Sequence, residues 1–188
     1  MLAPPSAEAA TFARAIPAER RPLALAPSDA RGWFGGAHIV CWDPAETRAG
    51  LSLSAAGGLL ERAMASPDPV LAAAVLPYDG PAEVRTYTGG LVRTAEGWRA
   101  WGSVTALPAA LDTGPAPRVP GPLILDPAAD LDEAGYRARV ERVRERIAAG
   151  DVYVLNLTYR IAGRPALAAA DAFGVLAERA AGPMSAWW

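Results

Sequence analysis

Residues 150–160 read Gly150-Asp151-Val152-Tyr153-Val154-Leu155-Asn156-Leu157-Thr158-Tyr159-Arg160 and directly follow a long amphipathic segment. That segment predicts a helix from Leu131 to Ala149, because its apolar side chains recur every three to five residues along one face: Leu131, Tyr136, Val140, Val143 and Ile147. Asp130 is the predicted N-cap, and Gly150 suits the left-handed backbone that ends a helix. The residues that follow predict a strand from Val152 to Ile161.

Asn156 is unusual in this predicted strand because it interrupts an apolar run. If the strand is central, Asn156 and Arg160 must be paired or solvated, since an unpaired buried polar group is costly. Two interpretations follow for these side chains. They form a hydrogen-bonded network inside the core, or they line a cleft that holds an anionic ligand.

The rest of the chain predicts an α+β fold, in which mixed or antiparallel sheets carry helices on the outside. The apolar and alternating patterns predict strands at 23–26, 38–42, 70–76, 84–94, 98–106 and 184–188, and helices at 7–15, 58–65 and 171–179. The strands at 84–94 and 98–106 are expected to form a hairpin around Gly97. We expect a strand-rich region at 1–107, a proline-rich linker or crossing loop at 108–125, and the start of a second domain at 126–188.

The composition excludes several functions. The net charge is -2 and lysine is absent, so the chain has no Schiff-base lysine and no basic block for nucleic acid or membrane lipid. One histidine, His38, and one cysteine, Cys41, exclude the common zinc sites and any internal disulfide. No secretory signal and no apolar run of membrane-spanning length occur, and a cytoplasmic location is expected. No catalytic set and no metal site emerges from the spacing of the remaining residues.

The junction around Gly150 resembles that of the chorismate-utilising enzymes. The resemblance rests on the helix that ends at Gly150, on Asp151 and Tyr153, and on the strand with Asn156 and Arg160. Within the family the Asn-Leu pair is most similar to the large subunit, or component I, of the aminodeoxychorismate synthases. Component I of the anthranilate synthases has a related junction. The resemblance implies the N-terminal portion of the fold that these enzymes share.

Two further segments resemble the family more loosely. Pro183-Met184-Ser185-Ala186-Trp187 is similar to a segment that cups a bound tryptophan in some members, together with an N-terminal loop. That loop corresponds to Phe34-Gly35-Gly36-Ala37, where the family has tyrosine, serine, arginine and phenylalanine. The resemblance therefore predicts a tryptophan-like amino-acid pocket, and the missing serine and arginine count against amino-acid binding there. Its residues would be Phe34, Gly35, Gly36, Pro183, Met184 and Ser185.

The resemblance implies an enzyme that makes 4-amino-4-deoxychorismate from chorismate and ammonia for p-aminobenzoate and folate synthesis. Magnesium and a glutamine amidotransferase subunit or domain are implied, with chorismate as the substrate. The family's general acid, lysine and magnesium ligands correspond to positions after Trp188, so we expect an N-terminal part that is inactive alone. Three alternatives remain open: an anthranilate synthase component I, an amino-acid-binding regulatory module without enzyme activity, and a non-functional truncated product.

Overall fold

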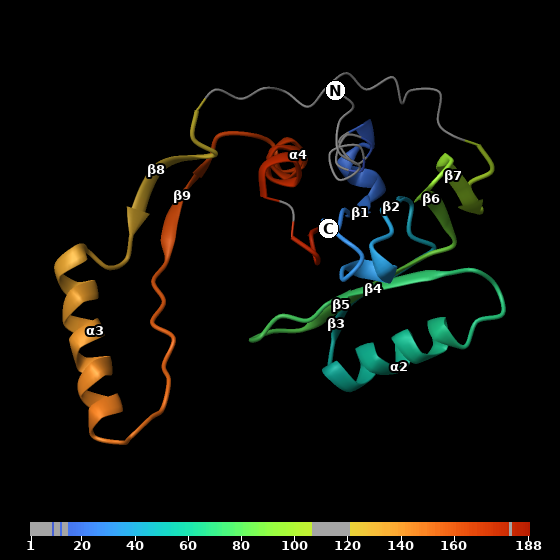
Figure 1. Cartoon of the computed structure of the whole chain (residues 1–188). Coiled ribbons are helices and arrows are strands. Elements are labelled where there is room, and N and C mark those ends of the chain that lie inside the picture. Colours follow the sequence, from blue (N-terminus) through green and yellow to red (C-terminus); the bar gives the residue numbers. More distant parts are fainter. Residues whose placement is uncertain (1–8, 10–11, 13–14, 107–120, 181) are drawn as a thin grey trace. The chain divides into compact units, whose positions relative to one another are not determined.

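The computed structural model describes residues 9, 12, 15–106, 121–180 and 182–188. The chain divides into two compact units (Figure 1). The first combines Met1–Val119 with Ala169–Trp188, and the second is Pro120–Ala168. Helices and antiparallel strands occur in both units, so the predicted α+β class is confirmed. The predicted boundaries at 107 and 126 stay a prediction about domains, but the structure groups residues 169–188 with the first unit.

A five-stranded antiparallel sheet, here called sheet A, is the centre of the first unit. Its strand order is β10-β1-β2-β6-β7. The strands are β1 (Leu23–Leu25), β2 (Ile39–Cys41), β6 (Gly89–Thr94), β7 (Gly97–Gly102) and β10 (Ala186–Trp187). The last strand therefore pairs with the first, with Ala24 opposite Trp187. The strands predicted at 23–26, 38–42 and 184–188 are confirmed, each slightly shorter than expected.

A second sheet, sheet B, contains β3 (Glu46–Leu51), β5 (Ala82–Tyr87) and β4 (Leu71–Val75) in the order β3-β5-β4. Helix α2 (Leu53–Met64) packs on one face of it, where Ala56, Ala82 and Val84 are buried together. The helix begins five residues before the predicted start at residue 58. The reason is a local cap: the hydroxyl of Ser52 accepts a hydrogen bond from the backbone N–H of Ala55 at 3.2 Å.

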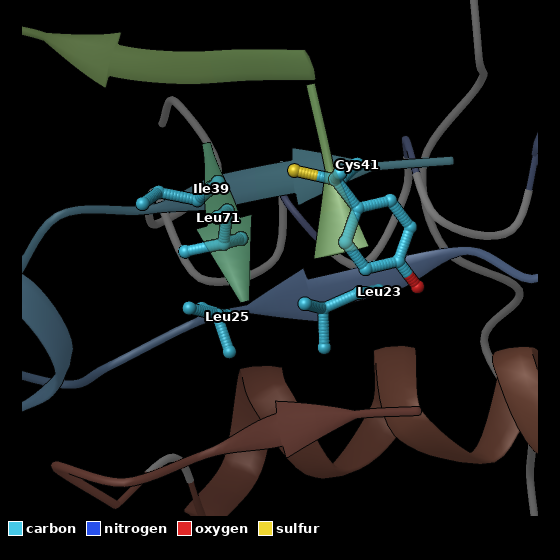
Figure 2. Close-up of a cluster of buried hydrophobic side chains, with 6 residues drawn as sticks. Leu23, Leu25, Ile39, Cys41 and Leu71 are labelled. Atoms are coloured by element: carbon cyan, nitrogen blue, oxygen red, sulfur yellow. The ribbon is translucent and has the colours of Figure 1, made fainter. Parts of the chain in front are cut away.

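Sheet A has a different core on each face, as the strand period of two requires. Ala24 and Val40 point into one core, which is covered by helix α4 (Ala169–Ala180) through Phe173. The alternate residues form the other core, which lies against sheet B. Figure 2 shows this cluster; its members are Leu23, Leu25, Ile39, Cys41, Leu71 and Tyr87. Two short 3-10 turns, η1 (Ala18–Arg20) and η2 (Trp33–Gly35), complete the described first unit.

The strand predicted from 84 to 94 is wrong as a single element. The chain leaves sheet B at the end of β5 and enters sheet A at Gly89, so these residues form two strands in different sheets. Glycines permit the close approach at this corner. A Cβ on Gly90 would lie 2.5 Å from the carbonyl oxygen of Val40, and one on Gly102 would lie 1.8 Å from that of Thr88. The predicted hairpin around Gly97 is confirmed as β6 and β7.

The second unit pairs β8 (Ile124–Ala129) with β9 (Ile161–Pro165) and carries helix α3 (Glu133–Ala148). The helix and its glycine stop are confirmed, since Gly150 has a φ of 79°. The predicted N-cap is wrong by two residues. Asp132 caps the helix, because its carboxylate accepts the N–H of Gly135 at 2.7 Å. The carboxylate of Asp130 instead accepts the N–H of Arg160 at 3.0 Å, next to the β8–β9 ladder.

The predicted strand from 152 to 161 is also wrong. Residues 152–160 have no regular secondary structure, and the strand begins only at Ile161. Asn156 is exposed, so the buried hydrogen-bonded network does not form around it. The physical reason is that a strand needs a hydrogen-bonded neighbour, and within 121–168 only β8 offers one, to residues 161–165.

The remaining predicted elements divide into three groups. The strand at 70–76 and the helix at 171–179 are confirmed by β4 and α4. For the helix predicted at 7–15, residues 9, 12 and 15 are helical and the others lie outside the described residues. The proline-rich linker lies mostly outside the described residues too. Strands β3 and β8 were not predicted.

Candidate functional site

The turn at residues 182–185, which contains the predicted pocket residues Pro183, Met184 and Ser185, packs against residues 26–32 of the first unit. The N–H of Ala26 donates to the carbonyl oxygen of Ser185 at 2.9 Å, and that of Ser28 donates to Gly182 at 3.1 Å. Gly32 is packed closely against this turn, because a Cβ there would lie 1.9 Å from the carbonyl oxygen of Pro183. The backbone of residues 26–32 is therefore held against residues 182–185.

The predicted pocket residues differ in exposure. Phe34 is 64% exposed and lies in η2 with a φ of 48°, and Gly35 and Gly36 follow with φ values of 71° and 88°. Met184 is also exposed. Ser185 has a structural partner, because its hydroxyl accepts the N–H of Gly182 at 2.8 Å and closes the turn.

The charged groups of this loop interact with each other. The Arg31 guanidinium donates to the Asp29 carboxylate at 2.8 Å, and the Arg31 backbone N–H donates to the same carboxylate, also at 2.8 Å. These hydrogen bonds hold the pKa of Asp29 at about 2. Both side chains remain on the surface, so this pair orders the loop and leaves no charge directed at a ligand.

An apolar cavity of about 370 Å³ lies next to this loop. Of the six predicted pocket residues only Phe34 lines it. The other lining residues belong to β1, α2, β4 and β10 or directly follow β4 and β10: Leu23, Leu25, Leu60, residues 71–76, Ala186 and Trp188. None of these side chains is charged. The contribution of residues 71–76 was not predicted, because their continuous apolar run indicates only a buried strand.

Trp188 forms one wall of the cavity, and its ring is contacted by a residue of sheet B. The Arg85 guanidinium lies over its ring, with 4.2 Å between the guanidinium carbon and the ring centroid. Arg85 also donates to the Glu83 carboxylate at 2.7 Å, and its side chain is only 12% exposed. Trp188 directly follows β10, so this contact joins the end of the last strand to β5.

The Cys41 thiol and the Tyr87 hydroxyl are chemically capable of catalysis, but both are buried in the core. Burial raises the pKa of Cys41 to about 12, so the thiol is protonated and unreactive at neutral pH. Tyr87 is completely buried, burial raises its pKa, and its hydroxyl donates to the carbonyl oxygen of Arg21 at 2.9 Å. Both side chains belong to the core between the two sheets.

The residues of the family-like junction lie in the second unit. Asp151 accepts a hydrogen bond from Arg146 at 2.7 Å, and both side chains are exposed. Tyr153 is 98% exposed. A cavity of about 390 Å³ lies beside α3, lined by Arg139, Arg142, Val143, Arg146, Leu155 and Leu157. Asn156 and Arg160 are not among the residues that line this cavity.

Among the described residues, no three or more histidine, cysteine, aspartate or glutamate side chains lie close enough together to hold a metal ion. The described side chains therefore do not fit a magnesium site, and no chemical step is derived through one. Among the described helices, none has both the length and the apolar character needed to cross a membrane.

Comparison with known proteins identifies the family. A model of the chorismate binding enzyme family matches residues 71–188, which is well over half of the chain. The chain belongs to the chorismate binding enzyme family. The match runs from β4 through α3 and the Gly150 junction to β10, and so includes parts of both units. No curated protein and no solved structure gives a significant match.

Proposed function

We propose that this chain is the N-terminal part of the large subunit of an aminodeoxychorismate synthase. The full enzyme replaces the hydroxyl group at C4 of chorismate with an amino group from ammonia. The family match over 71–188 supports chorismate as the substrate. The finer assignment rests on one observation, the sequence of the junction from Gly150 to Arg160 with its Asn156-Leu157 pair.

The exposure of the second unit supports the proposal that this chain acts as part of a larger enzyme. None of the described residues from 121 to 168 is buried. Large apolar side chains on this unit are exposed instead: Ile124, Leu125, Tyr136, Ile147, Tyr153, Val154, Leu155, Tyr159 and Ile161. A unit of this kind cannot be stabilised by apolar burial within itself. We therefore propose that further protein covers it in the active enzyme and that these residues alone are inactive.

Two components of the reaction remain proposals that rest on the resemblance. Ammonia would come from a glutamine amidotransferase subunit or domain. Magnesium would bind the substrate carboxylate, because a divalent ion is the strongest local charge available for a dianionic substrate. Its ligands would come from the catalytic part of the enzyme. A cytoplasmic location is proposed on the same basis.

The main alternative is an anthranilate synthase component I, whose junction is related. A second alternative is a regulatory module that binds an amino acid through Phe34, Gly35, Gly36, Pro183, Met184 and Ser185. The cavity beside these residues weakens that alternative. An amino acid carries an ammonium and a carboxylate group, and no charged side chain lines the cavity to pair with either.

The identity of the product tests the proposal. The coding sequence is extended downstream of Trp188 in the same frame, and the longer polypeptide is incubated with chorismate, ammonium chloride and magnesium chloride. We expect 4-amino-4-deoxychorismate by mass spectrometry, and no turnover by residues 1–188 alone. Anthranilate as the product would replace the proposal with the main alternative. A stop codon directly after Trp188 would reject the enzyme interpretation of this gene.

Titration with L-tryptophan tests the regulatory alternative. Calorimetry of residues 1–188 should show no saturable heat in the micromolar range. Saturable micromolar binding by a monodisperse protein would instead favour the module. The variant Phe34→Ala removes the predicted pocket residue that lines the cavity, so any specific binding should weaken in it.

A further inference from the structure

The cavity beside α3 in the second unit is lined by both charged and apolar side chains. Its volume of about 390 Å³ is that of a small-molecule site. The helix contributes Arg139, Arg142, Val143 and Arg146, and the segment after the helix contributes Leu155 and Leu157. All the cationic groups of this cavity therefore come from the helix.

Helix geometry places the three arginines of this cavity on one face. Residues three or four positions apart are neighbours on a helix surface, and Arg139, Arg142 and Arg146 follow this spacing. All three arginines are exposed, whereas Val143 and Leu157 are half-buried. The apolar side chains therefore form the deeper part of the lining, and the guanidinium groups lie nearer to solvent.

Two of the three arginines have no counter-charge among the described residues. Arg146 is paired with Asp151 at 2.7 Å. Arg139 and Arg142 form no ion pair in this part of the protein, because the other ion pairs of α3 use arginines that do not line the cavity. Glu145, the remaining carboxylate of the helix, does not line it either. The cavity thus carries two uncompensated positive charges beside an apolar surface.

We propose that this cavity binds a small organic oxyanion, that is, a molecule with one carboxylate or phosphate group on an apolar body. Guanidinium groups bind such oxyanions through paired, charge-assisted hydrogen bonds, so Arg139 and Arg142 can hold one group between them. The apolar body contacts Val143, Leu155 and Leu157 and removes their surface from water. The proposal is independent of the identity of the reaction product.

A set of small molecules tests the two halves of the proposed site. Phenyl phosphate has both the oxyanion and the apolar body, whereas inorganic phosphate and phenol each have one of them. Each is titrated into the full chain by calorimetry at pH 8 and low ionic strength. We expect phenyl phosphate to bind saturably and at least tenfold more tightly than either fragment. Benzoate, measured in parallel, distinguishes a carboxylate from a phosphate as the preferred group.

Three results of these titrations would overturn the proposal. Equal affinity of inorganic phosphate would mean that charge alone is recognised. Equal affinity of phenol would mean that only apolar contact is used. An absence of saturable binding by both phenyl phosphate and benzoate in the millimolar range would mean that the cavity is not a site for this class of ligand.

A matched pair of double variants locates the site. Arg139→Gln with Arg142→Gln should weaken the binding of phenyl phosphate at least tenfold. Arg137→Gln with Arg144→Gln removes the same charge from the same helix, at positions that do not line the cavity, and should leave binding unchanged. Because all four side chains are exposed, both variants should retain the helix, which circular dichroism checks. Equal weakening by the two variants, or none in the first, would overturn the proposal.

Discussion

The contact between Arg85 and Trp188 should contribute measurably to the stability of the first unit. Double-mutant cycles test it with Arg85→Met, Trp188→Leu and the combined variant. The guanidinium carbon lies 4.2 Å from the ring centroid, and the arginine side chain is only 12% exposed. A desolvated cation over a tryptophan ring is worth about 2 kcal/mol, so the coupling energy should lie at roughly 1–2 kcal/mol.

The chain contains a matched control for this cycle. Arg20 lies over Trp42 at 5.9 Å, and its side chain is 44% exposed. At that distance and exposure the coupling should be about 0.5 kcal/mol or less. Each arginine also pairs with a carboxylate, Asp43 for Arg20 and Glu83 for Arg85. Because the loss of that ion pair occurs in the single and the double variant alike, it cancels from the coupling energy.

The assay is urea unfolding followed by tryptophan fluorescence. All six tryptophans lie in the first unit, so the signal reports that unit alone. A difference of about 1.4 kcal/mol between the two couplings corresponds to about a tenfold difference in the equilibrium constant. If the Arg85 coupling fell below about 0.3 kcal/mol, or if the two couplings were equal, the assignment of Arg85 as the anchor of the last strand would be refuted.

Two further predictions concern backbone and burial. Gly102→Ala should lower the free energy of unfolding by about 1–3 kcal/mol, because the φ of Gly102 is 60° and the new Cβ would meet the Thr88 oxygen. Gly57→Ala in α2 should instead raise the free energy of unfolding by about 0.5–1 kcal/mol, because the new Cβ meets nothing within 4 Å. Chemical denaturation of the two variants decides this. Cys41 should not react with a thiol reagent at pH 8 until the protein unfolds. Since its pKa rises from 9.0 to about 12 on folding, only the unfolded state loses this proton between those values, and stability should fall with pH by up to about 1.4 kcal/mol per unit. A Cys41→Ala variant with the same alkaline slope would contradict the prediction.

The core of sheet A could be predicted because its signal is local. The alternation of Leu23, Ala24 and Leu25 assigns successive residues to opposite faces, and the structure places them in two different cores. The boundary between β5 and β6 could not be predicted in this way. Residues 82–94 all favour a strand, and the change of sheet depends on how closely Gly90 approaches Val40, which is a tertiary contact.

The candidate site was predictable only in part. The sequence suggested that the loop at Phe34 and the turn at Pro183 belong together, whereas the backbone hydrogen bonds to that turn come from Ala26 and Ser28, which precede the predicted loop. It did not indicate that the cavity beside them is formed by β4. That depends on the packing of sheet A over the edge of sheet B, and no periodicity in residues 71–76 encodes it.

The runs at 70–76 and 152–160 carry the same local signal, yet only the first forms a strand. The difference lies in the neighbours. Residues 71–75 pair with β5 and bury Leu71 against sheet A, whereas no described strand pairs with residues 152–160 and Tyr153 stays exposed. An apolar run favours a strand locally, but the strand forms only where a neighbouring strand is available to pair with it. Residues 152–160 should therefore become a strand wherever a neighbouring strand is available to pair with them.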